Sequence, residues 1–159
     1  MRYRGAGALF ALALVGAACG GRRGVEIDPN RELIGDRWNA TLATSAALAG
    51  AVQVKGSGWM AGDKDDTAKT LAFASIQNAV PGGEHPWHVH MGQCGNDRGI
   101  LGPPDAYKPL RVGGKGEAEA SAELPLPLPT AGQYFINVHA SRNNLGTILA
   151  CGNLAPPSR

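Results

Sequence analysis

The sequence predicts an all-β fold, a Greek-key sandwich or barrel of about eight short strands. From residue 38 onward, short segments alternate between apolar and polar residues, as strands with one buried face do. Turns rich in glycine and proline separate these segments, and this arrangement favours a sandwich or barrel over an α/β fold. At 159 residues, the chain is long enough for one domain with a proper core.

Residues 1–18 have the pattern of an export signal. Arg2 and Arg4 precede an apolar run, which ends in small residues and Cys19. This pattern resembles a bacterial lipoprotein signal, in which Cys19 becomes the lipidated first residue. The alternative is an ordinary secretory signal cleaved near Ala18. The apolar run is shorter than the roughly 20 residues that span a bilayer. We therefore expect a lipid-anchored protein of the cell envelope or periplasm, or otherwise a secreted one.

We expect residues 19–37 to form a flexible tether, because they are polar, contain Pro29 and show no apolar periodicity. The domain proper is then expected to span residues 38–159. Removal of residues 1–18 leaves 13 basic and 13 acidic residues. A neutral chain without a basic patch is not expected to bind nucleic acid.

Three strands are expected in the first half of the domain, over residues 38–44, 49–54 and 70–80. The alanine-rich segment 45–51 is also compatible with a short helix. In the third strand, Leu71 and Phe73 alternate with Ala72 and Ala74, so the two sets are expected on opposite faces.

Residues 92–109 contain too many glycines and prolines for a regular element, and we expect a long loop there. A glycine-rich turn at 113–116 then predicts a hairpin between residues 110–112 and 117–124. In its second strand, alanines are expected to face the core and glutamates the solvent. Three prolines at 125, 127 and 129 mark an exposed connection. Strands at 133–140 and 147–151 complete the set.

The segment HPWHVHMGQCG, residues 85–95, holds three of the four histidines. On a strand, His88 and His90 project from one face and Val89 from the other. Paired neutral imidazoles suit copper or zinc. A Greek-key sheet could bring the remaining histidine, His139, opposite this pair. His85 lies three residues before His88 and would point to the other face of a regular strand, although a fourth ligand is the alternative.

The domain also contains two cysteines, Cys94 and Cys151. In an exported protein they are expected to form a disulfide, and closing about 57 residues of chain would contribute around 4 kcal/mol of stability. The alternative is a pair of free buried thiols.

Three motifs together resemble the copper-zinc superoxide dismutases. HPWHVH is similar to their HGFHVH block, NVHAS to the VVHAS-type strand with the last copper histidine, and GTILACGNL to their closing GSRLACGVI. The resemblance covers roughly residues 70–154, about half of the chain. It implies an eight-stranded Greek-key barrel with one copper ion held by His88, His90 and His139. It also implies that His85 is structural and that Cys94 and Cys151 form the family's disulfide.

The chain departs from this family in the loop that holds zinc. Residues 99–114 contain no histidine, so the ligand that bridges copper to zinc and the zinc ligands are missing, and zinc is not expected. Asn143 stands where the family has an aspartate that links the two ligand sets. Ile148 replaces the arginine that guides superoxide, although the nearby Arg142 could substitute for it.

These departures predict a copper site with weak superoxide dismutation. Without the bridging imidazolate, the site lacks a proton acceptor, and without the arginine it attracts the anion less strongly. Two alternatives remain: an envelope protein that binds or buffers copper without turnover, and a structural barrel without metal.

Overall fold

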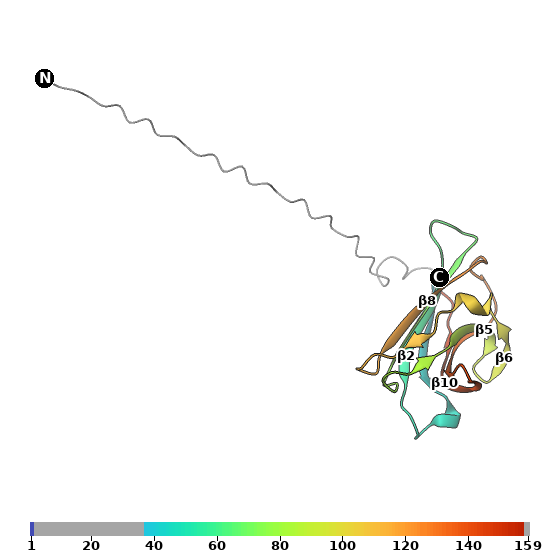
Figure 1. The fold of residues 1–159 in the computed structure, drawn as a ribbon. Coiled ribbons are helices and arrows are strands. Elements are labelled where there is room, and N and C mark those ends of the chain that lie inside the picture. Colours follow the sequence, from blue (N-terminus) through green and yellow to red (C-terminus); the bar gives the residue numbers. More distant parts are fainter. Residues whose placement is uncertain (2–36, 158–159) are drawn as a thin grey trace.

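The computed structural model describes residue 1 and residues 37–157 (Figure 1). Apart from Met1, the expected signal peptide (1–18) lies outside the described residues. So do Cys19 and, apart from Arg37, the expected tether (19–37). Within the described part of the chain, no helix is long and apolar enough to cross a membrane.

The described domain is an all-β structure, which confirms the predicted fold class. Its strands are β1 (Arg37–Thr44), β2 (Lys55–Gly62), β3 (Thr70–Gln77), β4 (Glu84–His85), β5 (Trp87–Gln93), β6 (Asn96–Ile100), β7 (Leu110–Arg111), β8 (Ala118–Leu124), β9 (Tyr134–Ser141) and β10 (Asn144–Leu154). Two short 3-10 helices, η1 (Ala46–Leu48) and η2 (Pro104–Ala106), are the helices of the described residues.

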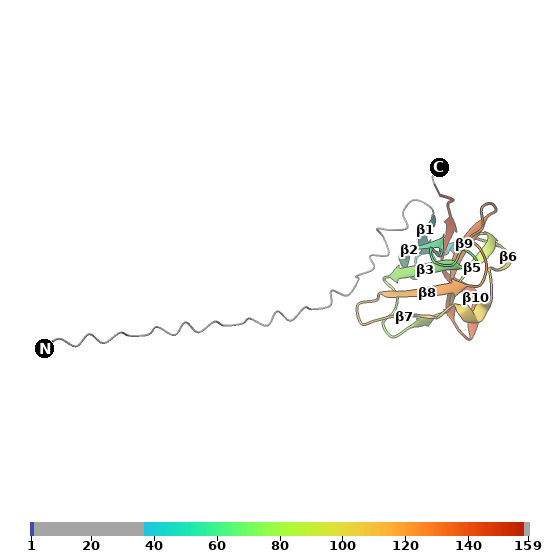
Figure 2. The same cartoon turned by 90° about the horizontal axis from the view of Figure 1, so that it is seen from above.

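Eight strands form one antiparallel sheet in the order β6-β5-β9-β10-β1-β2-β3-β8, and β4 pairs with β7 separately. After β3 the chain forms β4, β5, β6 and β7, and only then β8, which pairs with β3. In the same way, β9 pairs with β5 although three strands lie between them in the sequence. Connections of this kind, which skip neighbouring strands, are those of a Greek key. The sheet curls into a half-barrel, with β1, β2, β3 and β8 grouped on one side and β5, β6, β9 and β10 on the other (Figure 2).

The core lies inside the curl and is built by strand alternation. In β3, Ala72, Ala74 and Ile76 are buried, and the intervening residues are partly exposed. The predicted division of this strand into two faces is therefore confirmed. In β8, Ala118, Ala122 and Leu124 are buried while the glutamates are exposed, as predicted. Full burial of a side chain such as Leu124 or Ile76 contributes about 1.5–3 kcal/mol.

The strand predicted at residues 49–54 is wrong. The chain there forms a turn that follows η1, with Gly50 at a φ of +90°, and the second strand is β2, beginning at Lys55. The alternative prediction, a short helix at 45–51, is correct only in part, because the helical residues there are those of the 3-10 helix η1. Strand β2 was missed because Gly56 and Gly58 interrupt its alternation. Both are needed, since a Cβ at Gly58 would collide with the Ile136 side chain and one at Gly56 with the Ser75 carbonyl oxygen.

The prediction of a long loop at residues 92–109 is also wrong in part, because this segment contains β6 and η2. Cys94 and Gly95 form a two-residue turn between Gln93 and Asn96, which pair across the β5–β6 hairpin. Gly95 has a φ of +84°, a conformation that glycine adopts without steric cost. The glycines that we interpreted as breakers thus build the hairpin.

The hairpin predicted around residues 113–116 is half correct. The turn closes, since the Gly113 N–H donates to the Glu117 carbonyl over 2.9 Å. Its flanking strands do not pair with each other, because β7 pairs with β4 and β8 pairs with β3.

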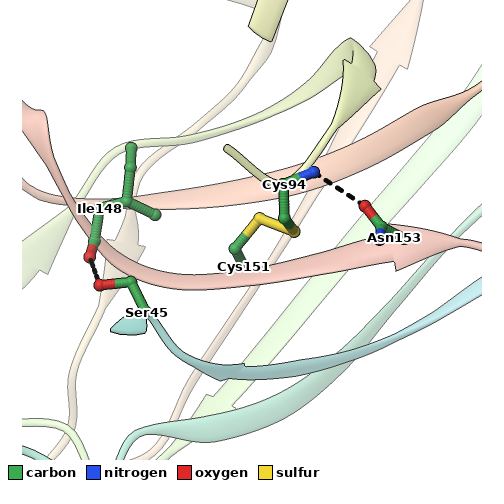
Figure 3. The surroundings of a disulfide bond; sticks show 5 residues. All are labelled: Ser45, Cys94, Ile148, Cys151 and Asn153. Atoms are coloured by element: carbon green, nitrogen blue, oxygen red, sulfur yellow. Dashed lines mark hydrogen bonds between the residues drawn. A yellow bond between two sulfur atoms is a disulfide. The ribbon is translucent and has the colours of Figure 1, made fainter. Parts of the chain in front are cut away.

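A disulfide joins Cys94 to Cys151, as predicted, and their Cα atoms are 6.0 Å apart. It ties the turn between β5 and β6 to β10 (Figure 3). The Cys94 N–H also donates to Asn153 Oδ1 over 2.8 Å. Further along β10, the Ser45 hydroxyl donates to the Ile148 carbonyl. The β5–β6 hairpin is therefore fixed to the sheet both covalently and by a hydrogen bond.

Candidate metal centre

The structure brings His88, His90 and His139 together. Their candidate ligand nitrogens all lie within 4.8 Å of one another. His88 and His90 are on β5 and His139 is on β9, and these strands pair with His88 opposite Asn137. Because residues two apart on a strand share a face, His139 lies on the same face as His88. The sequence pattern predicted this convergence from different parts of the chain.

The distances suit a metal ion. His88 Nδ1 lies 3.2 Å from His139 Nε2, and the three ring centroids are separated by 5.2–5.9 Å. Two metal–nitrogen bonds of about 2.0–2.1 Å, at angles between square and tetrahedral, place their nitrogens about 3 Å apart or slightly more. His88 and His139 therefore already have the nitrogen spacing of two ligands on one ion, and the candidate nitrogen of His90 lies within 4.8 Å of both.

In His90 and His139, hydrogen bonds determine which ring nitrogen carries the proton and which has the lone pair for a metal. His90 Nδ1 donates to Asp97 Oδ1 over 3.0 Å, and His139 Nδ1 donates to the Leu145 carbonyl over 2.6 Å. Because carboxylates and carbonyls only accept, the proton of each neutral ring is on Nδ1 and the lone pair is on Nε2. His90 Nε2 is buried and has no hydrogen-bond partner. Such an unpartnered group costs about 1–3 kcal/mol, which a metal ion would offset.

His88 faces His139 through Nδ1. In the metal-free chain this nitrogen donates to His139 Nε2, because the His139 proton is on the opposite side of that ring. For metal binding, the His88 proton must move to Nε2. The ligand atoms would then be Nδ1 of His88 and Nε2 of His90 and His139.

Burial keeps His88 and His139 neutral. The pKa of His88 is lowered to about 4 by burial and then by the neighbouring His139 and His90. The pKa of His139 is also lowered, mainly by burial. Neutral imidazole is the form that binds metals, so His88 and His139 are ready as ligands at neutral pH.

Two other residues singled out from the sequence lie apart from the three ligand atoms. His85 is buried in β4, and its Nδ1 donates to the Ala140 carbonyl over 2.9 Å, so this ring links β4 to β9. Asn143 is exposed in the turn between β9 and β10. A role for Asn143 in supporting the ligands remains a prediction.

Sequence reasoning missed Asp97 and Leu145 as hydrogen-bond partners of the ligand rings. The Cys94-Gly95 turn could have revealed the β5–β6 hairpin, which places Asp97 opposite Gly92, two residues from His90. A backbone carbonyl such as that of Leu145 has no sequence signal.

Tyr107 packs against the cluster. Its ring contacts His88 edge-to-face at 5.2 Å between centroids, and Trp87 at the same distance. The phenol donates to the Leu101 carbonyl over 2.6 Å, and burial raises the pKa of Tyr107 well above its usual range. Tyr107 therefore stays protonated and holds the His88 ring in place.

A cavity of about 470 Å³ lies beside His88, and its lining includes Tyr107, Lys108, Arg142 and Leu145. Arg142 is engaged by Glu84, with Nε 2.8 Å from a carboxylate oxygen. The cavity lining thus combines the cations Lys108 and Arg142 with the carboxylate of Asp105, and Glu84 offsets the charge of Arg142.

Comparison with known proteins does not identify the function of this site. No protein-family model matches the chain, and no curated protein matches it either. Its function therefore has to be argued from the histidine cluster itself.

Proposed function

We propose that this protein binds one copper ion through His88, His90 and His139 and is an exported relative of the copper-zinc superoxide dismutases. The observation that carries the proposal is the buried, unpartnered Nε2 of His90 beside two further imidazole nitrogens. The motifs around these histidines support the family assignment, as does the Greek-key order of the strands.

Copper is favoured over zinc by the donor set. Within the described residues, the candidate metal-binding group consists of three histidines, without a cysteine or carboxylate. Nitrogen ligands bind Cu(II) more strongly than Zn²⁺ in the general order of divalent metals. The loop that carries zinc ligands in the similar family has no histidine here.

Copper, when bound, would supply a one-electron centre, because imidazoles support both Cu(I) and Cu(II). Lys108 and Arg142, which line the cavity beside His88, would attract a small anion such as superoxide, while Asp105 in the same lining would oppose this attraction. Two features make slow dismutation the expected activity. Glu84 pairs with Arg142, and the uncharged Ile148 lies opposite His139 across the β9–β10 pair.

The same two features favour a second candidate, a protein that binds or buffers copper without turnover. We further propose a location in the cell envelope, with the chain anchored to the membrane through a lipid on Cys19. This follows from the sequence pattern of residues 1–19 alone.

Metal analysis and electron paramagnetic resonance test copper binding. The wild-type protein is expected to retain one copper ion and to give a tetragonal, nitrogen-coordinated Cu(II) signal. His139→Ala should lose this signal. His85→Gln is the matched control, since it removes a buried histidine outside the cluster and should keep the signal if the variant is folded. Failure of the wild type to retain copper at micromolar protein would leave only the structural barrel.

Superoxide decay then separates the two copper functions. The copper-loaded wild type should accelerate decay above the rate seen with His139→Ala. Equal rates, with copper bound only to the wild type, would exclude dismutation and leave copper binding or buffering.

A further inference from the structure

We infer that Asp97 is a positioning residue that makes the three-histidine centre prefer Cu(II) over Cu(I). The inference rests on the copper binding proposed above and assigns an oxidation-state preference to a residue outside the ligand set. It starts from the hydrogen bond between His90 Nδ1 and Asp97 Oδ1, 3.0 Å long.

The Asp97 carboxylate is held in place from two sides. Oδ1 also accepts the Gly99 N–H over 2.7 Å, and Gly99 has a φ of +112°, which other residues rarely adopt. The hairpin that carries Asp97 is fixed to β10 by the disulfide at Cys94. The orientation of the carboxylate toward His90 is therefore set by the backbone.

The three ligand rings differ in what supports them. His139 donates to the neutral Leu145 carbonyl, and His88 presents Nδ1 itself to the cluster. Among the described residues, Asp97 is the carboxylate that is hydrogen-bonded to a ligand ring. The side chain of His90 is only 4% exposed and that of Asp97 is 48% exposed. The negative charge therefore acts on this ring partly through the protein interior and is partly screened by solvent.

A carboxylate behind a metal-binding imidazole fixes the ring, keeps the proton on Nδ1 and makes Nε2 a stronger donor. It also supplies a negative charge, and the attraction between this charge and the ion is greater for Cu(II) than for Cu(I). Removing the charge should therefore weaken Cu(II) binding more than Cu(I) binding.

Asp97→Asn tests the charge with little change in shape. The amide oxygen can still accept from His90 and Gly99, so the ring should keep its place while the charge is lost. Asp65→Asn is the matched control, because Asp65 is an exposed carboxylate in the turn between β2 and β3. Affinities for Cu(II) and Cu(I) would be measured separately, by competition with a chelator for each oxidation state.

We expect Asp97→Asn to lower the Cu(II) affinity about 10–100-fold, as other outer-shell substitutions do. The Cu(I) affinity should fall only about 3–10-fold, because the Coulomb energy lost is proportional to the charge of the ion. Asp65→Asn should match the wild type in both measurements. Equal losses for the two ions, or an unchanged Cu(II) affinity, would overturn the inference while copper binding by the wild type stands. Absence of copper binding by the wild type would instead overturn the proposed function.

A measurement on metal-free protein tests the geometric premise separately. The ¹⁵N chemical shifts of His90 should place its proton on Nδ1 in the wild type, and Asp97→Ala should weaken this preference. A wild-type proton on Nε2 would overturn the inference whatever the copper affinities are.

Discussion

The three candidate ligand histidines differ in the atoms that their ring nitrogens contact. Asp97 and Leu145 hold Nδ1 of His90 and His139, and both of these rings thereby direct Nε2 to the cluster. His88 has no such support and is instead packed against Tyr107. The cluster is thus asymmetric, and His88 is the ring whose proton has to move when a metal binds.

The lowered pKa of His88 predicts how the stability of the metal-free protein depends on pH. Between pH 6.5 and about 4, the unfolded chain takes up a proton at His88 that the folded chain excludes. The stabilisation is therefore full above pH 6.5 and is lost as the pH falls toward 4. We expect this ring to contribute about 2 kcal/mol to that loss, after allowing for solvent screening.

Urea unfolding at pH 7 and at pH 4.5 measures this contribution. The wild type should lose more stability between the two conditions than His88→Gln, which lacks the titrating group. An equal loss in both proteins would contradict the role assigned to His88.

At the scale of the elements, the sequence predicted the strands that carry the site better than those that surround it. β5 and β9 alternate regularly, so the positions of His88, His90 and His139 followed from periodicity. β2 and β6 were missed because their glycines resemble breakers, although Gly56 and Gly58 allow close packing and Gly95 makes a turn. Local patterns do not encode such tertiary requirements.

Substitution of Gly58 tests the close packing of β2. Gly58→Ala places a Cβ against the Ile136 side chain and 2.8 Å from the Phe73 carbonyl oxygen. We expect a loss of about 1–3 kcal/mol in the free energy of unfolding. Gly114→Ala is the control, because a Cβ there meets nothing within 4 Å. Equal stability of the two variants in urea would show that β2 does not pack in this way.

Across the whole molecule, the curled sheet brings distant segments to one place. His88 and His139 are 51 residues apart in sequence, and Cys94 and Cys151 are separated by 57. The sequence predicted the all-β class and the disulfide. It did not predict the support from Leu145 and Asp97, which depends on the conformation of the backbone.

The disulfide is expected to stabilise the whole domain. Replacing both Cys94 and Cys151 by serine should lower the free energy of unfolding by about 2–4 kcal/mol, because the unfolded chain regains the freedom of a long loop. Urea unfolding of the wild type and the double variant, with and without reductant, measures this effect. Reductant should destabilise only the wild type. A double variant as stable as the oxidised wild type would contradict this expectation.

If the three histidines hold copper, protein purified from the cells that make it should contain this metal, and its copper content is the measurement that decides. We expect one copper ion per chain in the wild type and a loss of copper in His139→Ala. Wild-type protein that is folded but contains no copper, and that takes up none when Cu(II) is added, would contradict it.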